Sequence, residues 1–161
     1  MELAILTGIG PAGLVDLAGK PPLVFEQDVV VLGYRDGESA AEAGAPDPRT
    51  VAPGITLVDV DELRHKTPGA CGAQAAQQFA VEKRHFWLHL DLDVLDQGVL
   101  PAVDYQKPNG IKWEELADLV RPLARSPALV GADVTIYNPA LDPDGWYAAQ
   151  IVHWLGRIFA A

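Results

Sequence analysis

The chain alternates between short apolar runs and longer segments in which apolar residues recur at helical spacing. The apolar runs cover residues 28–34, 55–60, 85–94 and 129–137 and are rich in β-branched and aromatic side chains. Runs of this kind, bounded by turn-forming residues, predict buried β-strands. Residues 69–83, 112–125 and 146–159 are predicted to form helices, and Pro122 is expected to kink or shorten the second of them.

Strands that alternate with helices predict an α/β layered domain with a mainly parallel sheet. The first run, DVVVLGY, is almost continuously apolar, which is typical of a strand covered by helices on both faces. Residues 37–53 form the one low-complexity stretch, and we expect a surface loop there with a turn of helix at 39–43. That stretch is too short to separate domains, so residues 1–161 are interpreted as a single domain.

The amino-acid composition excludes some classes of binding partner. Of the 161 residues 49% are hydrophobic, enough for a sizeable core, and the net charge is −10. An acidic surface repels phosphate groups, so nucleic acid and anionic membranes are not expected as partners. No apolar run reaches the roughly 18 residues of a membrane span, and the opening residues lack the basic segment of a secretory signal. With a single cysteine, Cys71, the chain is expected to be cytoplasmic.

The sharpest chemical signal lies in HFWLHLDLDVLDQGVLP, at the end of the third predicted strand. If the strand continues through it, Trp87, His89, Asp91 and Asp93 share one face. Neighbouring carboxylates in an apolar setting repel each other, and a bound divalent cation such as Mg²⁺, Mn²⁺ or Zn²⁺ removes that conflict. Asp91 and Asp93 are therefore candidate metal ligands, with His89 orienting a ligand or binding the metal itself. The alternative is that these aspartates cap a helix or accept loop N–H groups.

Other candidate groups have simpler interpretations. The pair Asp59 and Asp61 is expected to cap a helix, because it lies in a polar stretch with no histidine on its face. Cys71 is interpreted as a plain small residue, because no histidine stands beside it in the sequence. The remaining histidines are expected at the surface or, for the last one, in helix packing: His65, His85 and His153. Neither serine lies in a Gly-x-Ser-x-Gly motif, so a serine hydrolase is excluded.

Three segments together resemble a known family. The stretch LHLDLDVLDQGVLPAVDYQKPNGI resembles the metal-binding region of the arginase–agmatinase (ureohydrolase) superfamily, while VVVLGYRDGE upstream and LVGADVTIYNPALDPDG downstream resemble its neighbouring strands in the same order. The resemblance covers nearly the whole chain but only the carboxyl-terminal half of the family. It implies a three-layer α/β fold lacking its amino-terminal half. It also implies two Mn²⁺ ions and hydrolysis of a C–N bond in a guanidino or amide-type small molecule.

The resemblance assigns roles to individual residues. Asp91 and Asp93 match the two carboxylate ligands, Asp96 matches the aspartate that shapes the following loop, and Asn138 with Pro139 matches the later strand end on the substrate side. The family's other metal ligands come from a Gly-Gly-Asp-His turn and an Asp-x-His-x-Asp segment, and neither occurs here. Two carboxylates cannot supply the ligands of two manganese ions. The chain alone is therefore expected to bind metal partially at most and to be weakly active or inactive.

This chain differs from the family's pattern in two further ways, one relevant to the substrate and the other to assembly. Many guanidino-hydrolases of the family carry glutamate two residues before Asn-Pro, where it meets the substrate's positive group, and Ile136 stands there in this chain. The family's missing strand lies between the strands predicted at 28–34 and 85–94. Unpaired strand edges close up, pair or aggregate, so we expect a collapsed gap, a homo-oligomer or a partner that supplies the missing half.

Two alternatives stay open at this point. The first is a non-catalytic remnant or assembly module with the same fold. The second is a haloacid-dehalogenase-type phosphatase, because an apolar strand ending in DLDVL also suits a nucleophilic aspartate with a helper two residues later. Such enzymes carry that motif near the start of the chain, with a lysine and an acidic pair well downstream. Here Lys107 and Lys112 follow too soon, and Asp142 and Asp144 would have to serve as the pair.

Overall fold

A computed structural model describes residues 2–17 and 19–160. The chain forms two compact units, Met1–Val58 and Asp59–Ala161, and each is described by itself. Among the described residues, no helix combines the length and the apolar character that a membrane span requires.

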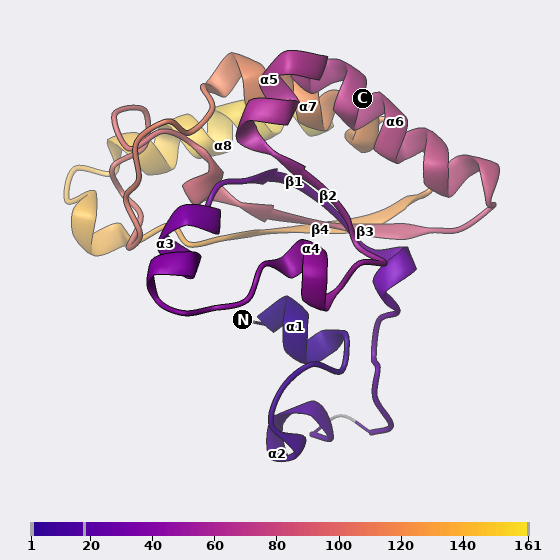
Figure 1. Ribbon diagram of the computed structural model, residues 1–161. Coiled ribbons are helices and arrows are strands. Elements are labelled where there is room, and N and C mark those ends of the chain that lie inside the picture. The colour runs from indigo at the N-terminus through magenta and orange to yellow at the C-terminus, as the bar shows by residue number, and fades with distance from the viewer. Residues whose placement is uncertain (1, 18, 161) are drawn as a thin grey trace. The chain divides into compact units, whose positions relative to one another are not determined.

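The first unit contains short elements around a two-stranded sheet (Figure 1). In chain order these are α1 (Glu2–Leu6), α2 (Ala12–Val15), the 3₁₀ turn η1 (Glu26–Asp28), β1 (Val30–Tyr34), α3 (Gly37–Glu42), α4 (Pro48–Val51) and β2 (Thr56–Asp59). Strand β1 pairs with β2. The stretch predicted as a loop with one helical turn contains two short helices, α3 and α4. The second helix begins at Pro48 because the Asp47 side chain caps it by accepting the Arg49 N–H at 2.8 Å.

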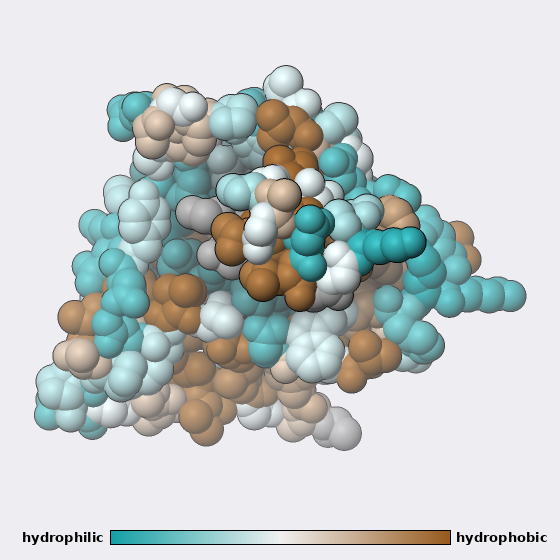
Figure 2. All heavy atoms as spheres, turned by 90° about the horizontal axis from the view of Figure 1, so that it is seen from below, coloured by the Kyte–Doolittle hydropathy of each residue, from teal (hydrophilic) through white to brown (hydrophobic). Residues whose placement is uncertain are grey.

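Apolar side chains lie at the surface of this first unit. Figure 2 shows hydrophobic residues gathered where α1 and α2 come nearest to the viewer. The large exposed side chains of this segment are Leu6, Leu14, Leu17, Leu23 and Phe25. The short helices of the segment therefore leave a sizeable share of their apolar surface uncovered.

The second unit packs helices on a parallel pair of strands. Its elements are α5 (Val60–Lys66), α6 (Pro68–Val81), β3 (Phe86–Asp91), the 3₁₀ turn η2 (Leu92–Val94), α7 (Trp113–Ala124), β4 (Leu129–Thr135), the 3₁₀ turn η3 (Pro139–Leu141) and α8 (Trp146–Phe159). Strands β3 and β4 are parallel, and helix α7 connects them. Helix α7 packs between α6 and α8, and Figure 1 shows these helices along one face of the β3–β4 pair. The predicted α/β alternation is confirmed.

The core of the second unit forms between the helices and one face of β3. Phe86 and Leu90 alternate inward along β3, and the Phe86 ring lies 5.0 Å from the ring of Phe79 on α6. The largest fully buried side chains of the described residues all belong to this unit: Leu63, Leu92, Leu95, Leu100, Ile111, Leu116, Val103 and Val120. This core holds the carboxyl ends of β3 and β4 side by side, where polar sites form in parallel sheets.

The buried carboxylate of Asp142 anchors the start of α8. It accepts the N–H groups of Tyr147 at 3.2 Å and Ala148 at 2.8 Å, and the hydroxyl of Tyr137 at 2.9 Å. Burial by itself raises the pKa of Asp142, but these donors and the N–H of Trp146 outweigh burial and lower that pKa below its ordinary value. The Asp142 carboxylate thus caps the first N–H groups of α8, because Gly145 at the N-cap position has no side chain that could accept them.

Several expected boundaries are corrected. The strand predicted at 85–94 ends at Asp91, because the chain turns into η2 and leaves the extended conformation. Helix α7 continues for two residues past Pro122, so the proline does not end it at once. Helix α5 follows the Asp59–Asp61 pair that was expected to cap a helix, although its bounds were not predicted. It begins because Asp59 accepts the N–H of Glu62 at 2.8 Å.

Candidate functional site

Asp91 and Asp93 lie at the carboxyl end of β3, but they do not share a strand face. Asp91 is the last strand residue, and Asp93 belongs to the turn η2. The Asp91 Oδ1 atom accepts the N–H of Asp93 at 3.2 Å, so the Asp91 side chain caps the turn that moves Asp93 out of the strand. The predicted alignment of four polar side chains on one face is therefore wrong for Asp93. Both aspartates are half-buried.

His89 is held by an aspartate on the neighbouring strand. Asp133 lies opposite His89 in the β3–β4 register, and its Oδ2 is 2.7 Å from Nδ1 of the imidazole. The second carboxylate oxygen of Asp133 accepts the indole N–H of Trp87 at 2.5 Å. On the other side of the ring, Nε2 lies 3.5 Å from the Thr135 hydroxyl. These four side chains form one hydrogen-bonded cluster on the sheet face that points away from the core.

The cluster lowers the pKa of Asp133. The hydrogen bond from the Trp87 indole is the largest cause, partial burial opposes it, and the hydrogen bond and charge of His89 add to the lowering. The carboxylate therefore stays ionised and accepts both donors. Sequence reasoning missed Asp133, although an aspartate inside the apolar run LVGADVTIY was a signal that could have drawn attention to it.

The loop after Asp93 is closed by backbone and side-chain hydrogen bonds. Asp96 Oδ1 accepts the N–H of Gly98 at 2.8 Å, and the Asp96 N–H donates to the carbonyl of Ile111 at 3.0 Å. From α5, one guanidinium nitrogen of Arg64 donates to the carbonyls of Asn109 at 3.1 Å and Gly110 at 2.8 Å. The two ends of the loop therefore lie beside each other, next to the candidate ligands.

Asn138 ties the end of β4 to the same loop. Its Nδ2 donates to Asp104 Oδ1 at 2.5 Å, and its Oδ1 accepts the N–H of Ala140 at 2.9 Å. The Asn138 N–H donates to the carbonyl of Ala102 at 2.9 Å. Ile136 lies two residues earlier with a positive φ of 70° and an exposed fraction of 40%. An apolar branched side chain is thus presented at this strand end from an unusual backbone conformation.

The residues present do not fit a pair of manganese ions. Among the side chains that the structure describes, in residues 3–17 and 19–160, no three or more His, Cys, Asp or Glu groups come together in a cluster that could hold a metal. His89, the candidate third donor, has both ring nitrogens directed at Asp133 and Thr135. Mn²⁺ prefers about six oxygen-rich ligands, and Asp91 with Asp93 supplies only part of one such set.

The remaining candidates occupy structural positions. Asp59 caps α5 as expected, whereas Asp61 lies in the first turn with its carboxylate 3.9 Å from Arg64. Cys71 is buried in α6, and burial raises the pKa of its thiol, which fits an unreactive small residue. The remaining histidines, His65, His85 and His153, are exposed.

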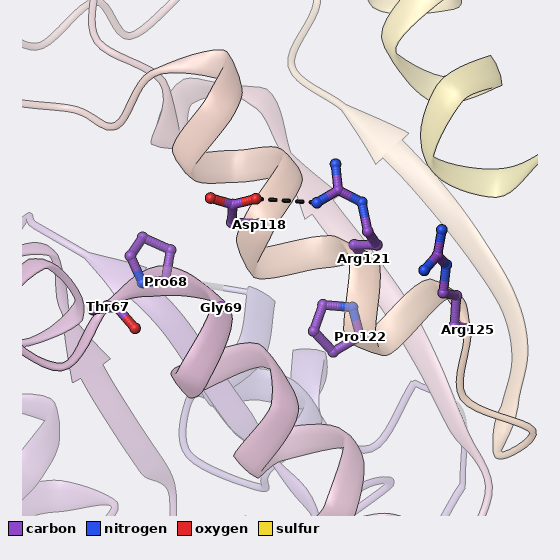
Figure 3. A pocket seen from close by; sticks show the side chains of 7 residues that line it. All are labelled: Thr67, Pro68, Gly69, Asp118, Arg121, Pro122 and Arg125. Atoms are coloured by element: carbon purple, nitrogen blue, oxygen red, sulfur yellow. Dashed lines mark hydrogen bonds and ion pairs between the residues drawn. The ribbon is translucent and has the colours of Figure 1, made fainter.

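A shallow pocket lies apart from these residues, between the start of α6 and α7. It has a volume of about 390 Å³ and is lined by Thr67, Pro68, Gly69, Asp118, Arg121, Pro122 and Arg125. Figure 3 shows Arg121 turned toward Asp118, and their side chains pair at 3.1 Å. Neither Asp91 nor Asp93 contributes to this pocket.

A parallel strand pair with helices on one face and acidic side chains at its carboxyl end defines an α/β protein with a strand-end site. The chain belongs to the arginase family, whose model, described as "Arginase family", matches residues 13–157.

Individual relatives agree with this family. An arginase of Staphylococcus aureus (strain MRSA252) is 26% identical over 159 residues, which cover 99% of this chain and 51% of the relative. A formimidoylglutamase of Enterobacter sp. (strain 638) is 34% identical over 107 residues, covering 62% and 33% of the two chains. The solved arginase of Bacillus caldovelox matches the fold with a TM-score of 0.82 at 24% identity, covering 100% of this chain and 52% of that one.

The chain spans about half the length of the arginases it matches. The resemblance read from the sequence is thereby confirmed, including its restriction to part of the family fold. The α/β class is confirmed as well.

Proposed function

We propose that this chain is the carboxyl-terminal half of a metal-dependent hydrolase that cleaves linear C–N bonds in guanidino or amide-type small molecules. In this proposal Asp91 and Asp93 are ligands to Mn²⁺, and the site is incomplete in the chain alone. The observation that carries the proposal is the arginase family match over residues 13–157, with the Asp-x-Asp pair at the carboxyl end of β3.

The geometry around the two aspartates supports a shared role. Asp91 and Asp93 lie where a parallel strand ends, and the loop that follows is closed by Arg64 and tied to β4 by Asn138. Carboxylate oxygens are suitable ligands for Mn²⁺. Because no third donor joins them in the described residues, binding of at most one ion with partial coordination is proposed for the chain alone.

The strand end bears on the choice of substrate. Ile136 exposes an apolar side chain there, and an isoleucine cannot form an ion pair with a positively charged group. This favours a substrate whose portion near Ile136 is uncharged. Among the matched relatives, names for both an arginase and a formimidoylglutamase occur, so we propose the hydrolase class without choosing between their substrates.

Titration of the chain with Mn²⁺ at neutral pH tests the metal role. Calorimetry should detect one weak binding event that disappears in the Asp91→Ala/Asp93→Ala double variant. The control is Glu38→Ala/Asp61→Ala, which removes two negative charges from exposed positions and should bind as the parent chain does. Unchanged Mn²⁺ binding in the Asp91→Ala/Asp93→Ala variant, with its fold intact by circular dichroism, would refute the assignment of these ligands.

A second candidate function is a non-catalytic assembly module of the same fold. The observation that favours it is that no metal-binding group of three side chains forms in the described part of the chain. The titration separates the two candidates, because an assembly module predicts no heat of Mn²⁺ binding at any ligand concentration.

A further inference from the structure

Asp104 lies in the loop after β3, where that loop pairs with the chain just beyond the end of β4. An isolated antiparallel bridge joins Val103 to Tyr137. The residue that follows Val103 and the residue that precedes Tyr137 are neighbours across such a bridge, and these residues are Asp104 and Ile136. The pairing therefore places an exposed carboxylate beside the exposed isoleucine at the strand end.

The Asp104 carboxylate is exposed, yet it is held in one orientation. Its Oδ1 accepts the Asn138 Nδ2 at 2.5 Å, and Asn138 is itself fixed because its Oδ1 accepts the Ala140 N–H at 2.9 Å. Val103, directly before Asp104, is buried and anchors the backbone. Among the side chains that the structure describes, none forms an ion pair with Asp104, and Asn138 alone donates to it, so Oδ2 remains available to a ligand.

The position and the chemistry of this oxygen both point to a cationic ligand group. Ligands of parallel α/β sheets bind outside the carboxyl ends of the strands, and Asp104 lies at that end of β4. A carboxylate oxygen binds most strongly to charged N–H donors, and a guanidinium group presents several of them in one plane. Ile136, which is 40% exposed, offers apolar surface next to the carboxylate. Together they suit a molecule with a cationic head and an adjoining aliphatic part.

We propose that Asp104 is a specificity-determining residue of the strand-end site and binds the cationic group of the substrate through Oδ2. Ile136 contacts the uncharged aliphatic portion of the same molecule, and Asn138 is the positioning residue that orients the carboxylate. This inference rests on the proposed function for the reaction. It narrows the substrate class from guanidino or amide-type compounds to guanidino compounds, because an uncharged amide gains less from a carboxylate.

Titration of the full 161-residue chain with two matched probes tests the proposal. The probe n-butylguanidinium carries the cationic group, whereas n-butylurea has nearly the same shape without the charge. Proton–nitrogen correlation NMR spectra in EDTA, at constant ionic strength, should show shifts at residues 102–105 and 136–138 when n-butylguanidinium is added. Its affinity should exceed that of n-butylurea by about three- to tenfold, between the effects of an exposed ion pair and of a hydrogen bond to a charged group.

Three variants assign the preference to individual side chains. Asp104→Asn removes the charge but keeps an oxygen for Asn138, so both probes should then bind within about twofold of each other. Asp16→Asn is the matched control, because it removes the same charge from an exposed position in the other unit, and it should keep the full preference. Ile136→Ala should weaken both probes alike, because the contact that it removes is apolar.

Each variant must keep the circular dichroism spectrum of the parent chain, and if Asp104→Asn does not, the two probes on the parent chain still decide. The proposal is overturned by equal affinities of the probes for the parent chain, by the absence of shifts at residues 102–105 and 136–138, or by a preference that survives Asp104→Asn.

The outcome is independent of the metal site, because EDTA is present throughout. If the chain binds Mn²⁺ through Asp91 and Asp93 but shows no preference for n-butylguanidinium, the role of Asp104 is refuted and the proposed function stands. If the preference is present but Mn²⁺ does not bind, the proposed metal role is refuted and the assignment of Asp104 stands.

Discussion

Asp133 Oδ2 lies 2.7 Å from Nδ1 of His89, across the parallel pair of strands and two residue pairs before their carboxyl ends. The same carboxylate accepts the indole N–H of Trp87, so one side chain positions two neighbours on β3. The orientation of the Trp87 and His89 side chains therefore depends on Asp133, which stands 44 residues away from His89 in the sequence.

Replacing Asp133 by asparagine should destabilise the chain by about 1 kcal/mol at neutral pH, the usual net value of a lost hydrogen bond at a partly exposed position. The folded state lowers the pKa of Asp133, so its contribution to stability is present above the unfolded value near 3.9 and is lost as the pH falls through the lower folded value. Urea denaturation of both proteins should show the difference at pH 7 and lose it in strong acid. Asp144→Asn, at an exposed position, is the control and should denature at pH 7 as the parent chain does.

Asp142→Asn should destabilise the chain more than Asp133→Asn does, because it alters a buried acceptor of three hydrogen bonds at the start of α8. The folded pKa of Asp142 is also lowered, so protonation in acid should reproduce part of the effect in the parent chain. Tyr137→Phe removes one donor and should give a smaller loss. Thermal unfolding followed at 222 nm measures the three variants and the parent chain. Equal melting temperatures for Asp142→Asn and the parent would contradict this account of α8.

Gly110→Ala should destabilise the chain by roughly 1–3 kcal/mol, the cost of forcing an extra carbon into a packed position. A Cβ atom at this glycine would lie 2.3 Å from the backbone nitrogen of Asp96, where the two ends of the loop meet. The comparison is Gly156→Ala in α8, where a Cβ meets nothing within 4 Å. That change should raise stability by about 0.5–1 kcal/mol, because alanine favours helix over glycine. Chemical denaturation should give opposite signs for the two variants.

Arg64→Ala should loosen the loop between Leu95 and Ile111. The variant lacks the Arg64 guanidinium and its two hydrogen bonds to the carbonyls of Asn109 and Gly110, which costs about 1–2 kcal/mol at this exposed position. Hydrogen–deuterium exchange of residues 95–111 should become faster, while α6 should keep its protection. Lys66→Ala removes an exposed ion pair with Glu62 on the same helix and should leave the loop unchanged. A loop equally protected in both variants would show that Arg64 does not hold it closed.

The position of the candidate site at a strand end could be predicted from the local sequence. An Asp-x-Asp pair after an apolar run marks a strand end, and the structure has Asp91 and Asp93 at such an end. Their relative orientation was not predictable, because alternation holds only while the strand continues. The hydrogen bond from the Asp93 N–H to Asp91 ends it. The role of Asp133 could not be predicted either, because no pattern in the sequence around it indicates a contact with His89.

The sequence by itself determined the kinds and order of the main elements. Apolar runs with β-branched residues became β1 to β4, and the amphipathic segment at residues 146–159 became α8, because the hydrophobic period matches the geometry of each element. Tertiary structure decided which side chains meet. The register of β3 against β4 places Asp133 opposite His89, and Phe86 packs against Phe79 of α6 while the next residue on β3, Trp87, is left exposed. Such contacts join distant residues through a shared core, so no local pattern in the chain specifies them.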